Sequence, residues 1–254
     1  MKRQKLTPLG VIAAVRGLPR GRAGAVVVGG APPLVTLLAK ELRDGRNAAA
    51  VREHGPLGGA EALVWVGAPD VDALRAASLA RVPIVAVTDA QQVPYVLETD
   101  LVRVPAGHGF PLEEIAAALA RRLGEHGPAL AAELPVLRDA VVSEQIRAAA
   151  RRNAVLAAGV IIPGVDMPVL TLSQIRLVMR IAEAYGLEIG RDRALEVLGV
   201  VGAGFGLRAL AREALDLVPV AGWALKGAVA YAGTKAVGEA ARRYFAETAV
   251  RRRS

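Results

Sequence analysis

The run from Gly29 to Thr36 carries the residue types and spacing with the most evident chemical potential in this chain. It matches part of the phosphate-binding pattern G-x-x-x-x-G-K-[ST], in which the backbone cradles phosphates, the lysine contacts their oxygens and the hydroxyl binds Mg²⁺. Gly29 and Thr36 hold the first and last positions of the pattern. Leu34, however, replaces the second glycine, and Val35 replaces the lysine. Because valine supplies no positive charge, we predict a vestigial loop at Gly29, Gly30 and Thr36 that binds no nucleotide cofactor.

Residues that could serve other chemistries are isolated in the sequence. Each of the three histidines adjoins a glycine and lies far from the other two, which is typical of surface loops and helix ends. The chain has no cysteine, which excludes disulfides, zinc–thiolate sites and thiol catalysis. No serine occupies a G-x-S-x-G nucleophile elbow, so we expect no catalytic residue and no metal site. The residues considered are His54, His108, His126, Ser78, Ser143 and Ser173.

A second glycine-rich run, Gly199 to Gly206, has the sequence GVVGAGFG. Its glycines do not have the spacing of the dinucleotide-binding pattern G-x-G-x-x-G, and a predicted helix rather than a strand precedes them. Close packing between helices therefore explains this run better than a dinucleotide site does.

The chain is basic, with 32 lysine and arginine residues against 24 aspartate and glutamate residues, which gives a net charge of +8. Its arginines are scattered along the chain, and aromatic residues make up only 4% of it. A nucleic-acid-binding surface concentrates its charge and usually interleaves aromatic side chains. We therefore expect no nucleic-acid partner. Anionic lipid headgroups are a better match for the basic clusters near the two termini.

Apolar strands and helical segments alternate through the first half of the chain. Continuous apolar strands separated by helices indicate a parallel sheet that is covered on both faces. We therefore predict a small three-layer α/β domain over residues 1–127. The predicted strands are Ala25–Val28, Ala48–Val51 (weakly), Ala62–Val66, Pro83–Val87 and Leu101–Val104, and the predicted helices are Leu34–Leu42, Val71–Arg81 with Asp70 as N-cap, and Leu112–Leu123.

The strand pattern stops near Gly127, and the remaining residues 128–254 have helical periodicity. Glycine and proline separate the helical segments, and Gly186 is a candidate helix C-cap. We predict an all-α domain of about four helices. They are Leu134–Ala158, Met167–Tyr185, Ala194–Leu217 and a last helix from Pro219 to about Ala246.

The last predicted helix has a row of alanines at intervals of four residues. Small residues at this spacing let another helix backbone approach closely, in water or in lipid. A tightly packed soluble bundle and a helix that associates with a bilayer both fit this row. Lys226 and Lys235 interrupt the segment, so a simple membrane span is not expected there. The row consists of Ala224, Ala228, Ala232, Ala236 and Ala240.

The order of elements in the first half resembles an Era-like G domain. The segments that carry the resemblance are Ala62–Asp70, Pro83–Ala90 and Val102–Leu119. Asp89 could stand for the aspartate of the base-reading N-K-x-D motif, but the Asn-Lys pair is absent. The Mg²⁺-side D-x-x-G motif is also absent between Asn47 and Trp65. This resemblance implies a degenerate, P-loop G-domain-like module with Asp89 as a vestigial base-reading position.

The second half resembles domain of unknown function 697, the YcjF-like, GTPase-associated domain. Its paired I-P-G and V-P-x-x-G turns, its Tyr-Gly helix end and its small-residue final helix lie in Gly159–Gly186 and Leu217–Phe245. The resemblance implies association with a bacterial membrane and partnership with GTPases, without an established activity. It therefore implies a location at the cytoplasmic side of the inner membrane, peripheral or shallowly inserted, with the cytoplasm as the alternative.

Together these features predict a non-catalytic, membrane-associated scaffold or regulatory protein. In this hypothesis a pseudo-GTPase module is fused to a GTPase-associated helical domain, and the expected partners are a membrane surface and a protein such as a GTPase. We expect no cofactor. Two alternatives remain open, namely a divergent GTP-binding protein or GTPase and a soluble structural helical bundle.

Overall fold

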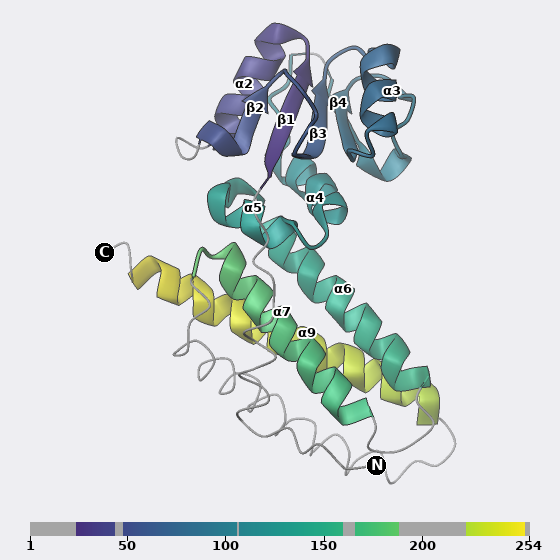
Figure 1. The fold of residues 1–254 in the computed structure, drawn as a ribbon. Coiled ribbons are helices and arrows are strands. Elements are labelled where there is room, and N and C mark those ends of the chain that lie inside the picture. The colour runs from purple at the N-terminus through teal and green to yellow at the C-terminus, as the bar shows by residue number, and fades with distance from the viewer. Residues whose placement is uncertain (1–23, 44–47, 106, 160–165, 188–221, 252–254) are drawn as a thin grey trace. The chain divides into compact units, whose positions relative to one another are not determined.

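The computed structural model describes residues 24–43, 48–105, 107–159, 166–187 and 222–251 (Figure 1). These residues form two compact units that divide between Glu144 and Gln145. The first unit contains a sheet and helices, and the second contains helices. The division lies inside helix α6 (Arg138–Gly159), which therefore contributes residues to both units. The expected fold class, an α/β module followed by helices, is confirmed at this level.

In the described part of the first unit, five strands form a parallel sheet at its centre, in the order β2-β1-β3-β4-β5. Five of the six residues of β1 and all five residues of β4 are buried. Burial on both faces is typical of a parallel sheet that is covered by other elements, as the apolar runs predict. The strands are β1 (Ala25–Gly30), β2 (Val51–Glu53), β3 (Ala60–Val66), β4 (Ile84–Thr88) and β5 (Leu101–Arg103).

Helices cover both faces of this sheet. Helix α3 (Val71–Leu79) buries Leu74 and Ala77 in a cluster with alternate residues of β1, β3 and β4. Helix α2 (Pro32–Arg43) contacts β1 and β2, and helix α4 (Leu112–Leu123) contacts β3, β4 and β5. The crossovers through α2 and α3 leave the centre of the sheet in opposite directions. Because such crossovers are right-handed, α2 and α3 lie on opposite faces, which gives the three expected layers.

Two helix ends follow local signals in the sequence. Helix α3 begins at Asp70, whose Oδ1 accepts hydrogen bonds from the N–H groups of Asp72 (3.0 Å) and Ala73 (3.1 Å). Helix α7 (Asp166–Ala184) is followed by Gly186 in the left-handed conformation, with φ 69°. Both the predicted N-cap and the predicted C-cap are therefore confirmed.

The connection from β2 to β3, residues 54–59, contains no helix. Parallel crossovers usually take a dozen residues or more. A shorter path suffices here because β2 has only three residues. Left-handed conformations at His54, Gly55 and Gly59 turn the chain, and Leu57 packs against the same apolar cluster as α3. The glycine-rich composition of residues 54–59 predicts a loop, and this prediction is confirmed.

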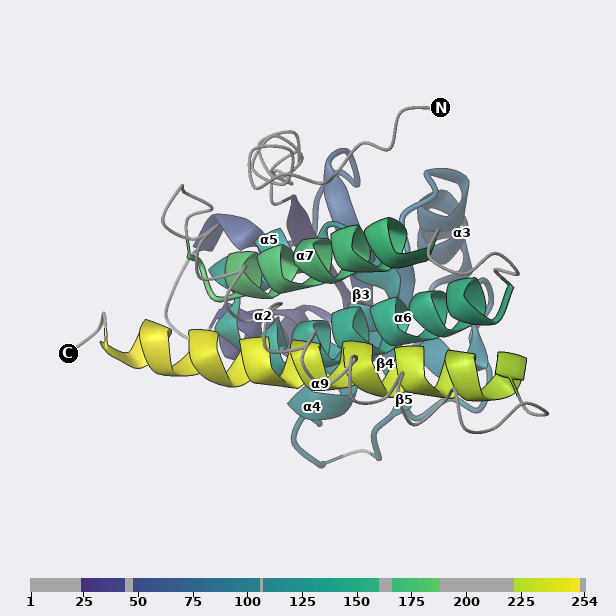
Figure 2. The same cartoon turned by 90° about the horizontal axis from the view of Figure 1, so that it is seen from below.

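Three helices are described in the second unit, namely the latter part of α6, α7 and α9 (Gly222–Arg251) (Figure 2). Ala157 of α6, Leu170 of α7 and Ala230 of α9 form one buried apolar cluster. The same three helices therefore share a core. Helix α9 runs antiparallel to α6, because its residue 227 lies against residues 154 and 158 of α6 whereas its residue 238 lies against residue 146.

A polar layer lies one helical turn from this apolar cluster. Asn153 of α6, Gln174 of α7 and Thr234 of α9 are at most 1% exposed. The Nδ2 of Asn153 donates a hydrogen bond of 2.9 Å to Oγ1 of Thr234. A buried polar contact of this kind favours one register between helices over others.

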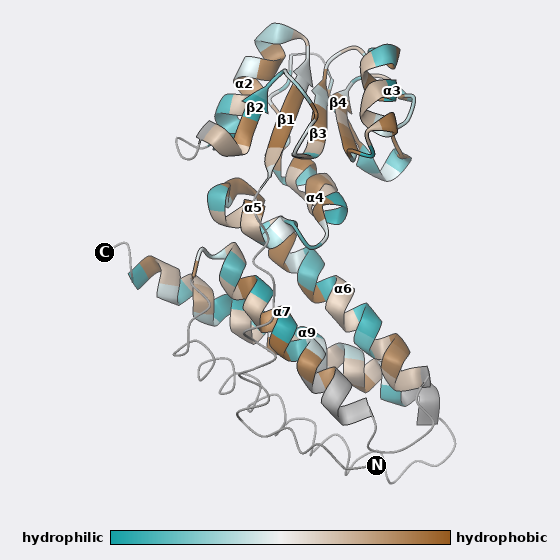
Figure 3. Ribbon diagram, in the orientation of Figure 1, coloured by the Kyte–Doolittle hydropathy of each residue, from teal (hydrophilic) through white to brown (hydrophobic). Residues whose placement is uncertain are grey.

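The alanine row of the last helix lies away from the core. The members of the row for which exposure is described are all exposed, whereas a different face of α9 is buried. In Figure 3 hydrophilic and hydrophobic residues are mixed along α9, so its colouring does not single out one apolar stripe. Close approach to α6 therefore takes place at two glycines, 227 and 238, and not along the predicted row. The exposed residues are Ala228, Ala232, Ala236 and Ala240, and the buried ones are Gly227, Ala230, Thr234, Val237, Gly238, Ala241 and Phe245.

Some predicted features lie outside the described residues. They are the helix Ala194–Leu217, the glycine-rich run Gly199–Gly206 and the beginning of the last helix at Pro219. Among the helices that the structure describes, none combines the length and the apolar character needed to cross a membrane.

Candidate functional site

The predicted phosphate loop is a junction of a single residue. Strand β1 ends at Gly30 and helix α2 begins at Pro32, so only Ala31 lies between them. Gly29 and Gly30 are strand residues, and Thr36 lies in the second turn of α2. A loop that wraps around phosphates needs several residues between strand and helix, and this connection does not provide them.

The start of α2 is also poor in hydrogen-bond donors. Pro32 and Pro33 have no N–H group. The N–H of Ala31 donates to the carbonyl oxygen of Val66, at 3.0 Å. Among residues 31–34, only Leu34 therefore keeps an N–H group that could face a ligand. Anion binding at a helix N-terminus depends on several such groups pointing at one anion, and this terminus offers few of them.

The two glycines of β1 allow close packing against β3. Gly30 has φ 126°, and a Cβ atom there would overlap the carbonyl oxygen of Val66. A Cβ atom on Gly29 would lie 3.2 Å from the ring of Trp65. Their observed role is therefore to let two strands and their side chains approach. That they are remnants of a nucleotide site stays a prediction.

The hydroxyl of Thr36 is engaged by a carboxylate. Its Oγ1 donates to Oε2 of Glu53 at 3.0 Å, and Nη1 of Arg43 donates to Oε1 of the same carboxylate at 2.7 Å. Hydrogen bonds from Arg43 and Thr36 hold the pKa of Glu53 below its ordinary value. Nη2 of Arg43 also donates to the carbonyl oxygen of Val51 at 2.9 Å. Thr36 thus helps to join α2 to β2.

Ligands of open α/β sheets usually bind at the carboxyl ends of the strands, where the strand order reverses. In this sheet the reversal lies between β1 and β3. Gly67 follows β3 there, and a Cβ atom on it would lie 3.3 Å from Cβ of Ala31 and 3.5 Å from Cδ1 of Leu34. Ala31 and Leu34 therefore lie close to the backbone of Gly67 at this switch point. Asp89, the predicted base-reading residue, follows β4, is exposed and accepts a 3.4 Å hydrogen bond from the hydroxyl of Thr88.

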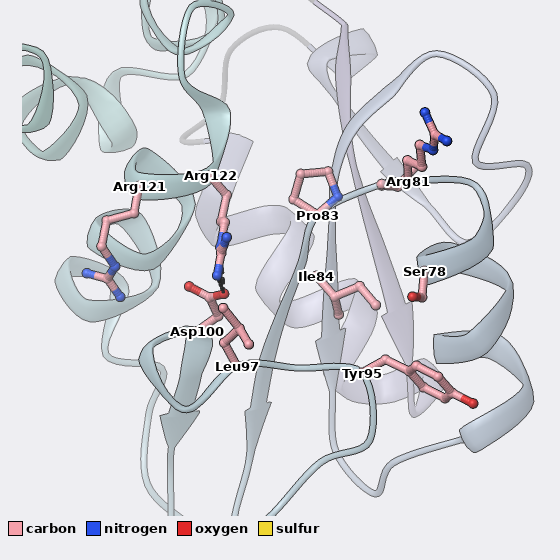
Figure 4. Close-up of a pocket in the computed structure, with 10 residues that line it drawn as sticks. Ser78, Arg81, Pro83, Ile84, Tyr95, Leu97, Asp100, Arg121 and Arg122 are labelled. Carbon is pink, nitrogen blue, oxygen red and sulfur yellow. Dashed lines mark hydrogen bonds and ion pairs between the residues drawn. The ribbon is translucent and has the colours of Figure 1, made fainter. Parts of the chain in front are cut away.

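A pocket of about 320 Å³ lies at the opposite edge of the sheet, where β4 and β5 begin (Figure 4). Apolar side chains and arginine, serine, tyrosine and aspartate side chains all line it. Sequence reasoning missed this site, because its residues come from the end of α3, the loop before β5 and the end of α4. The lining residues are Ser78, Arg81, Val82, Pro83, Ile84, Tyr95, Leu97, Asp100, Arg121 and Arg122.

The pocket lining contains an ion pair whose carboxylate is buried. Asp100 is 2% exposed. Its Oδ2 accepts a hydrogen bond of 2.6 Å from Nε of Arg122 and lies 2.5 Å from Nη2 of the same guanidinium. Figure 4 shows the Arg122 side chain directed at this carboxylate. The neighbouring Arg121 donates to the backbone carbonyl oxygen of Thr99. Since Arg122 neutralises Asp100, the net positive charge of the pocket comes from Arg81 and Arg121.

The pocket is also bordered by two residues in an unusual backbone conformation. Among the described residues, three other than glycine have positive φ: His54, Arg81 (57°) and Tyr95 (64°). Two of the three line this pocket. Left-handed conformations of large side chains are costly and cluster at functional sites, so they support a functional role for this surface.

The histidines lie at the surface, as expected. His54, His108 and His126 are all exposed. Nδ1 of His126 lies 3.5 Å from Oε1 of Glu61. The described part of the chain holds no cluster of three metal-ligating side chains. The geometry of these residues therefore indicates neither a metal centre nor a catalytic dyad.

Comparison with known proteins gives one finding for this chain. The family model described as "Domain of unknown function (DUF697)" matches residues 120–254. No curated protein and no solved structure matches. The match covers the helical half, in agreement with the resemblance of that half. The resemblance of the first half to an Era-like G domain is supported by no family model in this comparison.

Proposed function

The chain belongs to the family of the domain of unknown function DUF697, and with this as premise we propose that it is a non-catalytic scaffold or regulatory protein. Its α/β unit is a pseudo-GTPase module, which keeps the layered sheet but lacks the groups that hold a nucleotide. Its helical unit is the GTPase-associated, YcjF-like domain. The partner in this proposal is another protein, such as an active GTPase.

The observation that carries the proposal is the junction between β1 and α2. One residue connects the two elements, and the position that corresponds to the phosphate-binding lysine is Val35. Val35 is 0% exposed, so it belongs to the core under α2. A strand–helix connection of one residue, with few N–H donors and no positive charge, does not stabilise the β- and γ-phosphates of a nucleotide. The module therefore supports binding functions better than nucleotide hydrolysis.

We predict that the full chain binds neither GTP nor ATP more tightly than about 1 mM in the presence of Mg²⁺. This limit corresponds to about 4 kcal/mol of binding free energy. Isothermal titration calorimetry measures the affinity, and phosphate release measures hydrolysis. An active GTPase of similar size, titrated under the same conditions, provides the positive control.

The rival function is a divergent GTP-binding protein. Micromolar binding of GTP to the full chain would contradict the proposal and favour this rival. A substitution at the lysine position tests the same junction. Val35→Lys restores the missing lysine of the pattern but places a charge in the core. We expect this substitution to destabilise the α/β unit and to create no nucleotide affinity, because a buried unpaired charge is costly.

A basic and aliphatic surface on α6 supports membrane association as a second part of the proposed function. Arg151 and Val155 lie one turn apart on α6, and so do Arg152 and Leu156. All four are exposed, with Val155 72% and Leu156 42% accessible. Basic side chains beside exposed aliphatic ones suit the boundary between anionic headgroups and acyl chains. We propose peripheral association with the cytoplasmic side of the inner membrane through this face, which we call the α6 face.

We predict that the full chain sediments with vesicles that contain phosphatidylglycerol, and not with vesicles of phosphatidylcholine alone. Arg151→Glu with Arg152→Glu should weaken this binding by at least about tenfold, because each surface arginine contributes about 1 kcal/mol near anionic headgroups. Lys235→Glu with Arg243→Glu, two exposed positions on α9, gives the same change of charge and is the matched control. Equal loss in both pairs would indicate general electrostatics and contradict the role of the α6 face.

A further inference from the structure

Two large side chains at the mouth of the pocket are exposed to solvent. Tyr95 is 51% exposed and Leu97 is 59% exposed, and both lie in the loop between β4 and β5. Three further apolar residues, Val82, Pro83 and Ile84, line the same pocket. Tyrosine and arginine are the residue types most enriched at the energetic centres of protein interfaces. Exposed tyrosine and leucine side chains in a pocket that arginines also line therefore suit a surface that another protein covers.

Arg81 occupies a position where glycine is preferred. The N–H of Arg81 donates to the carbonyl oxygen of Ser78, and the N–H of Val82 donates to that of Ala77, both at 3.0 Å. These two bonds are those of a Schellman motif, in which the left-handed residue is usually glycine. Arginine at this position therefore costs stability without a gain within the fold.

The chain itself offers the comparison. Helix α7 ends in the same motif, with N–H groups of Gly186 and Leu187 donating to the carbonyl oxygens of Glu183 and Ala182 at 2.8 and 3.1 Å. Glycine is the left-handed residue there. The side chain at the end of α3 is therefore the unusual one, and it lies at the pocket.

The charges of the pocket indicate the sign of its partner. Arg81 and Arg121 lie on opposite sides of Pro83 and Ile84 in Figure 4, and both are exposed. The buried Asp100 is paired with Arg122. It therefore repels an incoming carboxylate less than an unpaired aspartate would. A second copy of this chain is a poor occupant, since the whole chain carries a net charge of +8.

We propose that this pocket binds an acidic segment of a partner protein. An apolar side chain of that segment enters between Ile84 and Leu97, its backbone lies against Tyr95, and its carboxylates pair with Arg81 and Arg121. The inference rests on the proposed function in one respect, since a scaffold needs a surface for its partner. It adds to that function the location of the surface and the chemistry of the partner.

The test uses the full chain as bait for a displayed library of short random peptides. We expect the selected peptides to contain both acidic and large apolar residues. Leu97→Ser and Arg121→Glu should each weaken their binding by at least about tenfold, which is the effect of an interface hot spot. Lys40→Glu, an exposed position on α2 with the same change of charge as Arg121→Glu, should change it by less than about twofold. Circular dichroism verifies that each variant is folded.

Two glycine substitutions separate binding from folding. Arg81→Gly and Tyr95→Gly each remove a pocket side chain and relieve a left-handed conformation. We expect both to weaken peptide binding by at least about tenfold, whereas the melting temperature rises by about 2–4 °C. A residue with a purely structural role would not combine lower affinity with higher stability.

Several outcomes would overturn the inference. They are failure to select any peptide, selection of peptides that bind all pocket variants as well as the unaltered chain, and equal effects of Lys40→Glu and Arg121→Glu. Loss of vesicle binding in the Leu97→Ser variant would assign the pocket to the membrane instead. Nucleotide titration is independent of these readouts, so failure of the proposed function remains distinguishable from failure of this inference.

Discussion

Replacement of Gly30 by alanine is expected to lower the free energy of unfolding of the α/β unit by at least about 3 kcal/mol. Gly30 has φ 126°, which L side chains rarely adopt, and a Cβ atom there would overlap the carbonyl oxygen of Val66. That oxygen also accepts the hydrogen bond from Ala31, so β3 cannot shift without losing this bond. Urea denaturation followed by circular dichroism measures the effect.

Alanine substitutions at Gly58 and Gly29 provide comparisons for the stability loss expected at Gly30. Gly58→Ala is the matched control, because a Cβ atom there meets nothing within 4 Å and its φ is not positive. We expect a change within about 0.5 kcal/mol for it. Gly29→Ala should lie between the two, since its Cβ atom meets side chains and no backbone, namely the ring of Trp65 at 3.2 Å and Cδ1 of Leu63 at 3.4 Å. A loss of unfolding free energy below about 1 kcal/mol for Gly30→Ala would contradict the packing role of Gly30. If the Gly30 variant does not fold, Gly29→Ala still provides a measurable comparison with Gly58→Ala.

Replacement of Gly238 by leucine in α9 is expected to destabilise the helical unit by about 3 kcal/mol. A Cβ atom on Gly238 would lie 2.6 Å from Cγ1 and 3.0 Å from Cγ2 of Ile146 on α6. These atoms are near the backbone of α6 and cannot move aside cheaply. The gain in helix propensity over glycine, about 1 kcal/mol, is smaller than the cost of overpacking. Thermal and urea unfolding of the full chain measure the difference.

The control for this prediction lies on the opposite side of the same helix. Ala236 is exposed, and Ala236→Leu should change the stability by no more than about 0.5 kcal/mol. Ile146→Ala combined with Gly238→Leu should cost less than the sum of the single changes, with a coupling of about 1–2 kcal/mol. Additive effects would mean that the two residues are not in contact. Destabilisation by Ala236→Leu would restore the alanine row as the packed face.

Local patterns in the sequence were sufficient for most elements of the first unit. The helix predicted at Leu112–Leu123 coincides with α4, and the strand predicted at Ala62–Val66 lies within β3. Asp70 and Gly186 are recognisable as caps because a cap depends on a few neighbouring residues. Continuous apolar runs indicate burial on both faces, which favours a parallel sheet.

The roles of the glycines in β1 could not be predicted in the same way. A glycine that faces a phosphate and a glycine that faces another strand have the same sequence signature. The distinction depends on Val66 and Trp65, which lie on β3 and are distant in sequence. The length of the connection between β1 and α2 could not be predicted from the sequence either. Pro32 is compatible with a helix that begins directly after the strand and with one that begins several residues further along the chain.

The pocket and the packed face of α9 were missed for a related reason. Arg81 and Tyr95 have an unusual φ that nothing in their residue types indicates, and the pocket combines three separate segments. Helix α9 has small or apolar residues on several sides, so its periodicity does not identify the buried face. Tertiary contacts select that face, among them those of Gly227 and Gly238 with α6.

The shortness of the outer strands has a consequence for solubility. Among the strands that the structure describes, β2 and β5 are the outermost; they have three residues each and carry Arg52, Glu53 and Arg103. An open edge offers unpaired backbone groups to other chains, and short, charged edge strands are a common defence against aggregation. An added strand would find few backbone partners here. The apolar strands at the centre are thereby protected from amyloid-like stacking, and capture of a peptide by extension of the sheet is disfavoured at both edges.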